Sequence, residues 1–332
     1  MGKINLALLA GGWSGEREIS LQSGEAVYRA LDKRKYNVTR YDPRDDLVTL
    51  IKERGRIDLA FVLLHGKFGE DGCIQGFLDL LGIPFVGSGV LSSAMSLNKK
   101  LSKQMYMSAG LNVIKDVILC EGQNFTTDHI MEVVGPSTVV KPVAEGSSLG
   151  MSVCHSEEDL LKGIHMALEY GKEIMIEQYV KGMEITCCVI GNRTLDAMPL
   201  IEIVPTSDYA FFDYDAKYTP GATREICPAR LPGSQSQRAQ SCAKKAHKVL
   251  KCKVWSRTDM IIQGDKIYLL ETNTIPGMTE NSLVPLAAKV AGMSLSQLVD
   301  KLVELSLELT DSGLLLTRQH RKDPRSSNHC FQ

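Results

Sequence analysis

The chain has 332 residues, a formal net charge of −1 and 44% hydrophobic residues. This length is enough for two or three domains with a sizeable core. The balanced charge argues against a nucleic-acid-binding protein, which would carry a basic stripe or patch. No apolar run reaches the length of a membrane span, and the first residues meet glycine and charge too soon for a signal peptide.

Nine cysteines are scattered along the chain without CxxC spacing. An odd number of cysteines without an export signal indicates a reduced cytoplasmic protein rather than a disulfide framework. We expect buried structural thiols and no zinc site. Cys187 and Cys188 are adjacent in a strand-like run, so their side chains should point to opposite faces of a sheet.

The first ninety residues alternate apolar strands with helices, which is typical of parallel β-α-β units. The expected strands are residues 4–10, 36–41, 59–64 and 84–86. The expected helices are residues 17–31, 47–53 and a third that ends at 81. Near residues 87–96 the chain crosses toward a second unit.

The rest of the chain is more mixed. The expected helices are residues 97–109, 157–170, 234–250 and 294–308. The expected strands are residues 137–141, 151–154, 174–179 and 184–190, followed by a β-hairpin from residue 254. Residues 206–223 are aromatic and acidic without periodicity, and their length indicates a functional loop. The tail at 313–332 is polar, and we expect it to be disordered.

The hairpin is the most informative segment. Glu271 and Asn273 are two apart on its second strand, so they share one face. Asp259 lies twelve residues before Glu271, and a three-residue turn at 264–266 would set the two carboxylates opposite each other. Two carboxylates and an amide oxygen suit Mg²⁺, which usually completes its shell with phosphate and water. This segment therefore predicts a metal–phosphate site.

Two loops in the first unit are candidate ligand sites. The loop from Gly11 to Glu16 presents backbone N–H groups at a helix N-terminus, but it matches neither G-x-G-x-x-G nor a Walker motif. A plain strand-to-helix turn has about equal weight, and a buried Glu16 could instead hold a substrate ammonium. His65 follows a buried strand, where open α/β sheets place ligand loops. A structural histidine that satisfies loop carbonyls is slightly favoured there.

Two later segments are compatible with a nucleotide site. Lys141 ends a strand before a Gly-Ser-Ser-Leu-Gly loop, which could cover phosphate while the lysine neutralises its charge. A surface hairpin explains the same residues equally well. Glu177 and Glu184 could hold an adenine edge and a ribose, although solvated charges at a strand end are the favoured local interpretation.

Seven motifs follow one another along the chain: GGWSGEREIS (11–20), HGKFGEDGCIQG (65–76), GIPFVGSG (82–89), VKPVAEGSSLG (140–150), EQYVKGMEIT (177–186), FFDYDAKY (211–218) and SRTDMII with YLLETNTIPGMTENSLVP (256–285). In this order they resemble the D-alanine–D-alanine ligases of the ATP-grasp superfamily, from about residue 4 to residue 308. The resemblance implies an α/β (α+β composite) chain with the ATP-grasp fold and an N-terminal parallel-sheet α/β domain.

The resemblance also implies domain boundaries. Residues 1–96 would form the N-terminal domain with the first D-alanine site. Residues 97–183 would form the central subdomain, with the ATP lid and the adenine pocket. Residues 184–312 would form the C-terminal subdomain, with the magnesium site, the lid loop and the second D-alanine site.

The implied reaction makes D-alanyl-D-alanine for peptidoglycan. ATP would phosphorylate the carboxylate of one D-alanine, and the amine of a second would attack the acylphosphate. Phosphoryl transfer depends mainly on positioning and charge neutralisation. The resemblance implies ATP, two Mg²⁺ ions that Mn²⁺ can replace, two D-alanine molecules and a homodimer.

The family motifs imply a role for each matching position. The residues that would bind ATP are Lys99, Lys141, Ser148, Glu177, Val180, Glu184 and Lys217. The metal ligands would be Asp259, Glu271 and Asn273. The residues that would bind D-alanine or the reacting atoms are Glu16, His65, Arg257, Gly277, Ser282 and Leu283. Ser147 and Tyr218 would link with Glu16 and close the site against water.

Five positions depart from the family pattern without removing a ligand. The family usually has Asp in place of Asn98, a longer residue in place of Ala144 and Tyr in place of Phe212. It usually has Gly in place of Ser256 and an aliphatic residue in place of Thr258.

A D-alanine–D-lactate or D-alanine–D-serine ligase is the nearest alternative, and the Lys217–Tyr218 pair favours the dipeptide ligase. A catalytically inactive nucleotide-binding regulator is disfavoured by the intact Arg257 and metal ligands. A dehydrogenase is weaker still, because no G-x-G-x-x-G follows the first strand.

Overall fold

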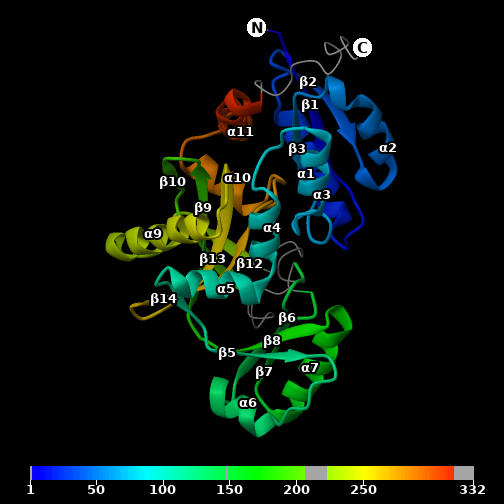
Figure 1. The fold of residues 1–332 in the computed structure, drawn as a ribbon. Helices are drawn as coiled ribbons and strands as arrows, with labels where there is room; N and C mark the ends of the chain where they lie inside the picture. The colour runs from blue at the N-terminus through cyan, green and yellow to red at the C-terminus, as the bar shows by residue number, and fades with distance from the viewer. Residues whose placement is uncertain (1, 147–148, 206–222, 318–332) are drawn as a thin grey trace, which may run out of the picture.

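The computed structural model describes residues 2–146, 149–205 and 223–317, with side chains as far as residue 310. Three sheets, each with helices packed against it, organise these residues (Figure 1). In the described part of the chain, no helix is long and apolar enough to cross a membrane.

The first sheet is parallel and has the strand order β2-β1-β3. Its elements are β1 (Ile4–Leu9), α1 (Arg17–Ala30), β2 (Tyr36–Tyr41), α2 (Pro43–Glu53), η1 (Arg54–Arg56), β3 (Leu59–Val62) and α3 (Cys73–Leu81). Alternate residues of β1 enter different cores, so α2 and α3 cover one face while α1 lies on the other. The expected strand at 84–86 is a single parallel bridge between Ala60 and Phe85.

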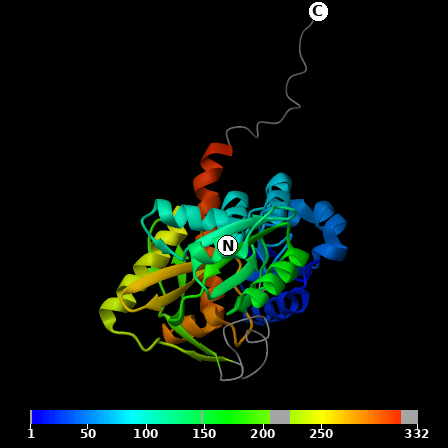
Figure 2. The same cartoon turned by 90° about the horizontal axis from the view of Figure 1, so that it is seen from below.

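The second sheet is antiparallel, with the order β5-β8-β6-β7. Its elements are β5 (Asp116–Cys120), α6 (Thr127–Val134), β6 (Thr138–Pro142), β7 (Ser152–Cys154), α7 (Glu157–Tyr170) and β8 (Glu173–Gln178). Both helices pack on the sheet around one core that contains Ile130 and Ile164. Viewed from below (Figure 2), this sheet lies in front of the junction between the other two.

The third sheet has seven strands, with the order β12-β11-β9-β13-β14-β4 and β10 beside β9. Its strands are β4 (Asn112–Val113), β9 (Met183–Gly191), β10 (Leu195–Ala197), β11 (Ile201–Pro205), β12 (Thr223–Ile226), β13 (Trp255–Gln263) and β14 (Lys266–Asn273). Its helices are α4 (Val90–Leu97), α5 (Lys99–Ser108), α9 (Gly233–Val249), α10 (Leu283–Val290) and α11 (Leu295–Thr317). Cys187 and Cys188 of β9 enter different cores, which confirms that they face opposite sides of the sheet.

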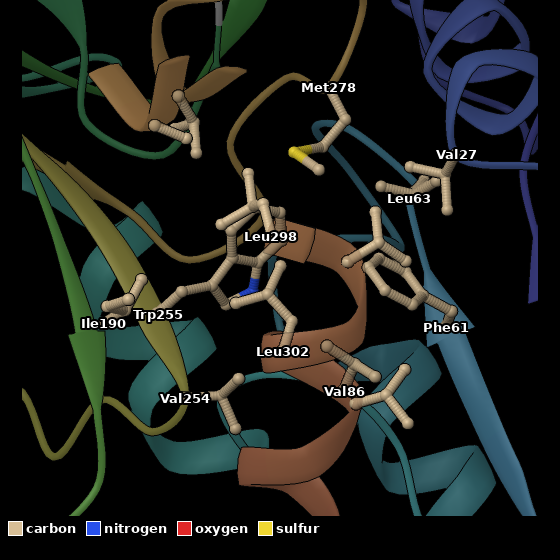
Figure 3. Close-up of a cluster of buried hydrophobic side chains, with 14 of the residues drawn as sticks. Val27, Phe61, Leu63, Val86, Ile190, Val254, Trp255, Met278, Leu298 and Leu302 are labelled. Carbon is tan, nitrogen blue, oxygen red and sulfur yellow. The ribbon is translucent and has the colours of Figure 1, made fainter. Parts of the chain in front are cut away.

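One hydrophobic core joins the first sheet to the third. Trp255 of β13, Phe61 of β3 and the α11 residues Leu298 and Leu302 all belong to this core (Figure 3). The Phe61 and Trp255 rings meet edge to face, with 6.5 Å between their centroids. Since this core is buried, it fixes the loops of the first sheet relative to the hairpin β13–β14.

Several expected boundaries were wrong. Helix α2 begins at Pro43, because Asp42 caps it by accepting a hydrogen bond from the Arg44 N–H. The crossing at 87–96 is mostly helix α4, which Asn98 separates from α5. Helix α11 runs to Thr317, so residues 313–317 are helical rather than disordered.

Some expectations fall where the structure gives no description. Residues 318–332, the remainder of the expected disordered tail, lie outside the described residues. So do residues 206–222, which form nearly all of the expected functional loop, whereas Thr223 begins β12. Among the eight described cysteines, none forms a disulfide. Cys73 and Cys120 are exposed, so the expectation of burial was wrong for those two.

Candidate active site

The hairpin β13–β14 places Asp259 directly opposite Glu271, as its spacing predicted. The turn is shorter than expected, because Gln263 pairs with Lys266 and only two residues lie between them. Gly264 has a φ of 56°, which fits the first central position of a type II′ turn.

A β-bulge compensates for the shorter turn. Met260 pairs with Leu269, whereas the next pair is Asp259 with Glu271, so Leu270 has no partner of its own. The extra residue restores the pairing that a three-residue turn would have produced.

Asp259 is the most heavily hydrogen-bonded carboxylate of the hairpin. Arg257 donates from Nε to Oδ1 and from Nη2 to Oδ2, each at 3.0 Å. Thr186 of β9 donates to Oδ1 at 2.5 Å, and Asn273 Nδ2 lies 3.4 Å from Oδ2. These donors hold a side chain that is only 8% exposed in a single orientation.

The donor set of Asp259, Glu271 and Asn273 fits Mg²⁺. Two carboxylates and an amide supply hard oxygen ligands, and rotation of the Asn273 amide would present oxygen in place of nitrogen. Among the residues that the structure describes, no three His, Cys, Asp or Glu side chains are grouped to hold a metal by themselves.

Helix α5 contacts the hairpin through a chain of hydroxyl groups. The Tyr106 hydroxyl donates to Thr272 Oγ1 at 2.7 Å, and Thr272 Oγ1 lies 3.0 Å from Thr258 Oγ1. All three side chains are buried. The hydroxyl of Thr258, where the family usually has an aliphatic residue, is therefore satisfied.

A cavity beside the hairpin carries the expected phosphate ligands. Lys99 Nζ donates to the Glu145 carbonyl at 2.6 Å and lies 3.5 Å from Glu271 Oε2. The residues that line this cavity are Lys99, Lys141, Pro142, Glu145, Leu149, Met151, Glu184, Asp259, Leu270 and Glu271. We name it the phosphate-side cavity.

Residues around the lysines explain two departures from the family pattern. Asn98 caps α5 by accepting a hydrogen bond from the Leu101 N–H at 3.0 Å, a role that Asp would also fill. Ala144 is exposed in the turn after β6, where a longer side chain would reach solvent or a ligand.

Glu177 is buried, so the interpretation as a solvated strand end was wrong. Its Oε2 lies 2.5 Å from Lys141 Nζ, and its Oε1 lies 2.7 Å from Lys103 Nζ. Burial raises the pKa of Glu177, but Lys141 and Lys103 outweigh it and the pKa lies below the ordinary value. Burial likewise lowers the pKa of Lys141, but Glu177 outweighs it and the pKa is raised.

Lys103 is a charged site residue that the sequence interpretation missed. It is 2% exposed and lies one helical turn after Lys99 on α5, so the i, i+4 spacing was the available signal. Val180 is buried, and Glu184 on β9 reaches the phosphate-side cavity.

A second cavity of about 440 Å³ lies on the other side of Glu271. Its polar residues include Glu16, His65, Glu70, Arg257, Glu271, Asn273, Thr279 and Ser282, and its floor includes Gly277 and Leu283. We name it the substrate-side cavity. Glu271 therefore borders both cavities, whereas Asp259 lines the phosphate-side cavity and Arg257 lines the substrate-side cavity.

His65 joins three segments of the substrate-side cavity. Its Nδ1 lies 3.0 Å from the Ile275 carbonyl and its Nε2 lies 3.4 Å from Ser23 Oγ, while Ser23 accepts the Met278 N–H. Burial lowers the pKa of His65, which favours the neutral ring. His65 thus satisfies a loop carbonyl, as the structural alternative expected, and also lines the cavity.

Glu70 is a second residue that the sequence interpretation missed. It is 8% exposed, and it accepts the Gly66 N–H at 2.8 Å. Burial, assisted by the nearby Glu16 charge, raises the pKa of Glu70 to about 8. The only local sign of this role in the sequence was the position of Glu70 in a polar loop directly after a buried strand.

Glu16 lies where the loop that begins at Gly11 meets the segment after β6 that contains Gly146. A Cβ built on Gly66 would lie 2.8 Å from Glu16 Oε2, and one built on Gly146 would lie 3.0 Å from it. The Ser14 hydroxyl accepts the Glu16 N–H and donates to the His65 carbonyl. The first loop is therefore built around a buried acid and is more than a plain turn.

The start of α10 forms the far wall of the substrate-side cavity. The Thr279 N–H donates to Ser282 Oγ at 3.0 Å, and Gly277 approaches the same hydroxyl. Ser282 is the N-cap of α10, and Leu283 is its first residue. Free N–H groups at such a helix start favour an anion.

The remaining expected residues have separate outcomes. Ser147, Ser148, Phe212, Lys217 and Tyr218 lie outside the described residues. Ser256 is buried beside His247, with 2.8 Å between Oγ and Nδ1, so its hydroxyl is satisfied.

Comparison with known proteins places these features in context. The model "D-ala D-ala ligase N-terminus" matches residues 42–88, and "D-ala D-ala ligase C-terminus" matches residues 105–304. A D-alanine–D-alanine ligase of Syntrophobacter fumaroxidans is 53% identical over 306 residues, which cover 92% of this chain and 98% of that protein.

Solved structures agree with the sequence comparison. The crystal structure of D-alanine–D-alanine ligase from Bacillus anthracis complexed with ATP has a TM-score of 0.80 at 31% identity, covering 93% of this chain and 99% of that one. The VanG D-Ala:D-Ser ligase of Enterococcus faecalis has a TM-score of 0.77 at 31% identity, covering 92% of this chain and 100% of the other.

Proposed function

Because the chain belongs to the D-alanine–D-alanine ligase family, we propose that it uses ATP to join two D-alanine molecules into D-alanyl-D-alanine for peptidoglycan. The observation that carries this proposal is that Glu271 borders both cavities, one lined by two lysines and the other by Arg257, Glu16 and His65. A phosphate donor and a carboxylate acceptor would meet at that point.

The phosphate-side cavity would hold ATP. Lys99 and Lys141 would neutralise its phosphates, together with Ser148 and Lys217. The base and ribose would lie against Glu177, Val180 and Glu184, with Leu270 and Met151 as apolar contacts. The Bacillus anthracis relative was solved in complex with ATP, which supports ATP as the nucleotide.

Asp259, Glu271 and Asn273 would hold two Mg²⁺ ions, which Mn²⁺ can replace. When bound, these ions would neutralise charge on the phosphates. Arg257 already contributes a positive charge to Asp259, and Lys99 contributes one beside Glu271. This chain therefore surrounds its two carboxylates with cations even before ATP enters.

The first D-alanine would bind in the substrate-side cavity. Glu16 would pair with its ammonium, and the neutral His65 would lie near its carboxylate, which takes the phosphoryl group. Arg257 and the Gly277 N–H would stabilise the oxyanion when the amine of the second D-alanine attacks. The C–N bond forms first and gives a tetrahedral intermediate. The C–O bond to phosphate then breaks, so inorganic phosphate leaves and the amine nitrogen gives up a proton.

The second D-alanine would place its carboxylate at the start of α10. Ser282 and Leu283 lie at that helix N-terminus, where backbone N–H groups favour an anion. Ser147 and Tyr218 would link with Glu16 and close the site, and this matters because an acylphosphate is readily hydrolysed.

The decisive experiment measures ADP release with D-alanine, D-serine and D-lactate offered as second substrates, with the products identified by mass spectrometry. We expect D-alanyl-D-alanine as the main product. A main product containing D-serine or D-lactate would favour the alternative ligases, one of which is represented by the VanG structure. ATP binding without any ligation would favour the regulator.

Three further assignments complete the proposal. The protein would act as a homodimer in the cytoplasm, where ATP is available and its free thiols stay reduced. It would have domains at residues 1–96, 97–183 and 184–312. Size-exclusion chromatography with light scattering tests the homodimer.

A further inference from the structure

The ammonium of Lys103 is fully used inside the protein. Its Nζ donates to the Ile114 carbonyl at 2.6 Å and lies 2.5 Å from Asp116 Oδ1 and 2.7 Å from Glu177 Oε1. Three acceptors match the three donors of an ammonium group. Since the side chain is 3% exposed, solvent does not compete for these bonds.

Each carboxylate oxygen of Glu177 pairs with a different lysine, and the two lysines differ in how many other partners hold them. Lys141 holds Oε2 and also lines the phosphate-side cavity. Lys103 holds Oε1 and is anchored by Ile114 and Asp116 as well. An entering phosphate can therefore attract Lys141 away from Glu177, whereas Lys103 stays in place.

The departure of Lys141 would leave Glu177 with a single cation. A buried carboxylate without a cation takes up a proton, because burial disfavours its charged form. An ionised carboxylate only accepts hydrogen bonds, whereas a protonated one can also donate. Adenine presents an amino group at its six position, whereas guanine presents a carbonyl oxygen. An ionised Glu177 can therefore accept only from adenine, whereas a protonated Glu177 could also donate to guanine.

We propose that Lys103 is a positioning residue that keeps Glu177 ionised while Lys141 binds phosphate, and that it thereby sets the preference for ATP over GTP. This inference rests on the proposed function in one respect, the placement of the base against Glu177. Lys103 itself would contact neither the nucleotide nor the amino acids.

The chain offers a matched control for this role. Lys100 on α5 pairs with Glu173 on β8 at 2.6 Å, so it joins the same helix and strand as the Lys103–Glu177 pair. Lys100 is 39% exposed, however, and its carboxylate partner is not Glu177. K103M and K100M therefore each remove one ion pair between α5 and β8. Only K103M takes a cation from the buried carboxylate, and it also removes the bonds to Ile114 and Asp116.

The experiment measures ATP and GTP dissociation constants by calorimetry without D-alanine, and the KM for both nucleotides and for D-alanine. For K103M we expect ATP binding to weaken at least about tenfold, equivalent to ~1.4 kcal/mol, with a much smaller loss for GTP. The KM for D-alanine should stay within about twofold, as should every constant of K100M. Equal weakening of ATP and GTP, or an unchanged ATP preference, would overturn the proposal.

A double-mutant cycle separates positioning from general destabilisation. In an E177Q background, K103M should change ATP affinity by less than about twofold, because no charge remains to be held. Effects that simply multiply would contradict the role. If K103M does not fold, K103Q provides the same comparison, since its amide can still donate to the Ile114 carbonyl. Failure to form dipeptide while ATP preference depends on Lys103 would overturn the proposed function alone.

Discussion

Arg257 donates one hydrogen bond to each carboxylate oxygen of Asp259, both at 3.0 Å. The guanidinium is thereby held in a fork geometry that a lysine cannot reproduce. One side chain thus orients a proposed metal ligand and also faces the substrate-side cavity.

Replacement of Arg257 should reduce the rate more than nucleotide binding. We expect R257K and R257A to lower kcat by roughly 100- to 1,000-fold, because the proposed role of the guanidinium is to stabilise charge that develops only in the transition state. The Kd for ATP should change only a few-fold. Steady-state kinetics and calorimetry on the same preparations test this, and equal losses in both quantities would argue against an oxyanion role.

Loss of a metal ligand should make turnover insensitive to added Mg²⁺. For E271Q and D259N we expect losses greater than the roughly 10- to 100-fold that an outer-shell partner costs. D265N is the control, because Asp265 is exposed in the turn of the same hairpin. Activity is measured as Mg²⁺ is titrated after chelation. An E271Q enzyme with a normal magnesium response would remove Glu271 from the ligand set.

A methyl group at Gly66 should affect D-alanine binding through Glu16. Gly66 and Gly110 have φ angles of 68° and 70°, so alanine at either position costs about 1–2 kcal/mol in backbone strain. Only at Gly66 does a Cβ meet Glu16, whereas nothing lies within 4 Å at Gly110. G66A should therefore raise the KM for D-alanine, and G110A should not. Urea unfolding checks that the two variants lose similar stability.

Glu70 should make stability fall as the solution becomes alkaline. Its pKa is about 8 in the folded protein against 4.5 as the ordinary value, so the folded state holds a proton that the unfolded chain has already lost. This contribution is complete below about pH 4.5 and disappears as pH rises through 8, a change on the order of a few kcal/mol.

The isosteric variant E70Q isolates this effect. The free energy of unfolding should decrease from pH 5 to pH 8.5 more steeply in the wild type than in E70Q, whose amide oxygen can still accept the Gly66 N–H. E169Q, on the exposed surface of α7, should follow the wild type. Parallel curves for wild type and E70Q would show that Glu70 is already ionised at pH 5.

Sequence reasoning succeeded where spacing alone was sufficient. The alternation of strands and helices predicted the parallel first sheet, and the twelve-residue interval predicted that Asp259 faces Glu271. The sequence could not show which turn produces this pairing. A two-residue turn with a bulge and a three-residue turn both place Asp259 opposite Glu271.

It failed where burial depends on distant residues. Glu177 reads locally as a strand end, but its cations come from Lys103 and Lys141, which lie 74 and 36 residues earlier in the chain. Residues 112–134 contain two short strands and a short helix without strong periodicity, so no element was predicted there.

The bulge in β14 has a consequence for how the two halves of the site are coupled. In a regular strand, neighbouring side chains point to opposite faces, so an apolar contact for the nucleotide and a metal ligand could not be consecutive. Here Leu270 and Glu271 both line the phosphate-side cavity. Deletion of Leu270 would remove the bulge and keep Asp259 opposite Glu271, yet the phosphate-side cavity would lose the apolar side chain beside Glu271.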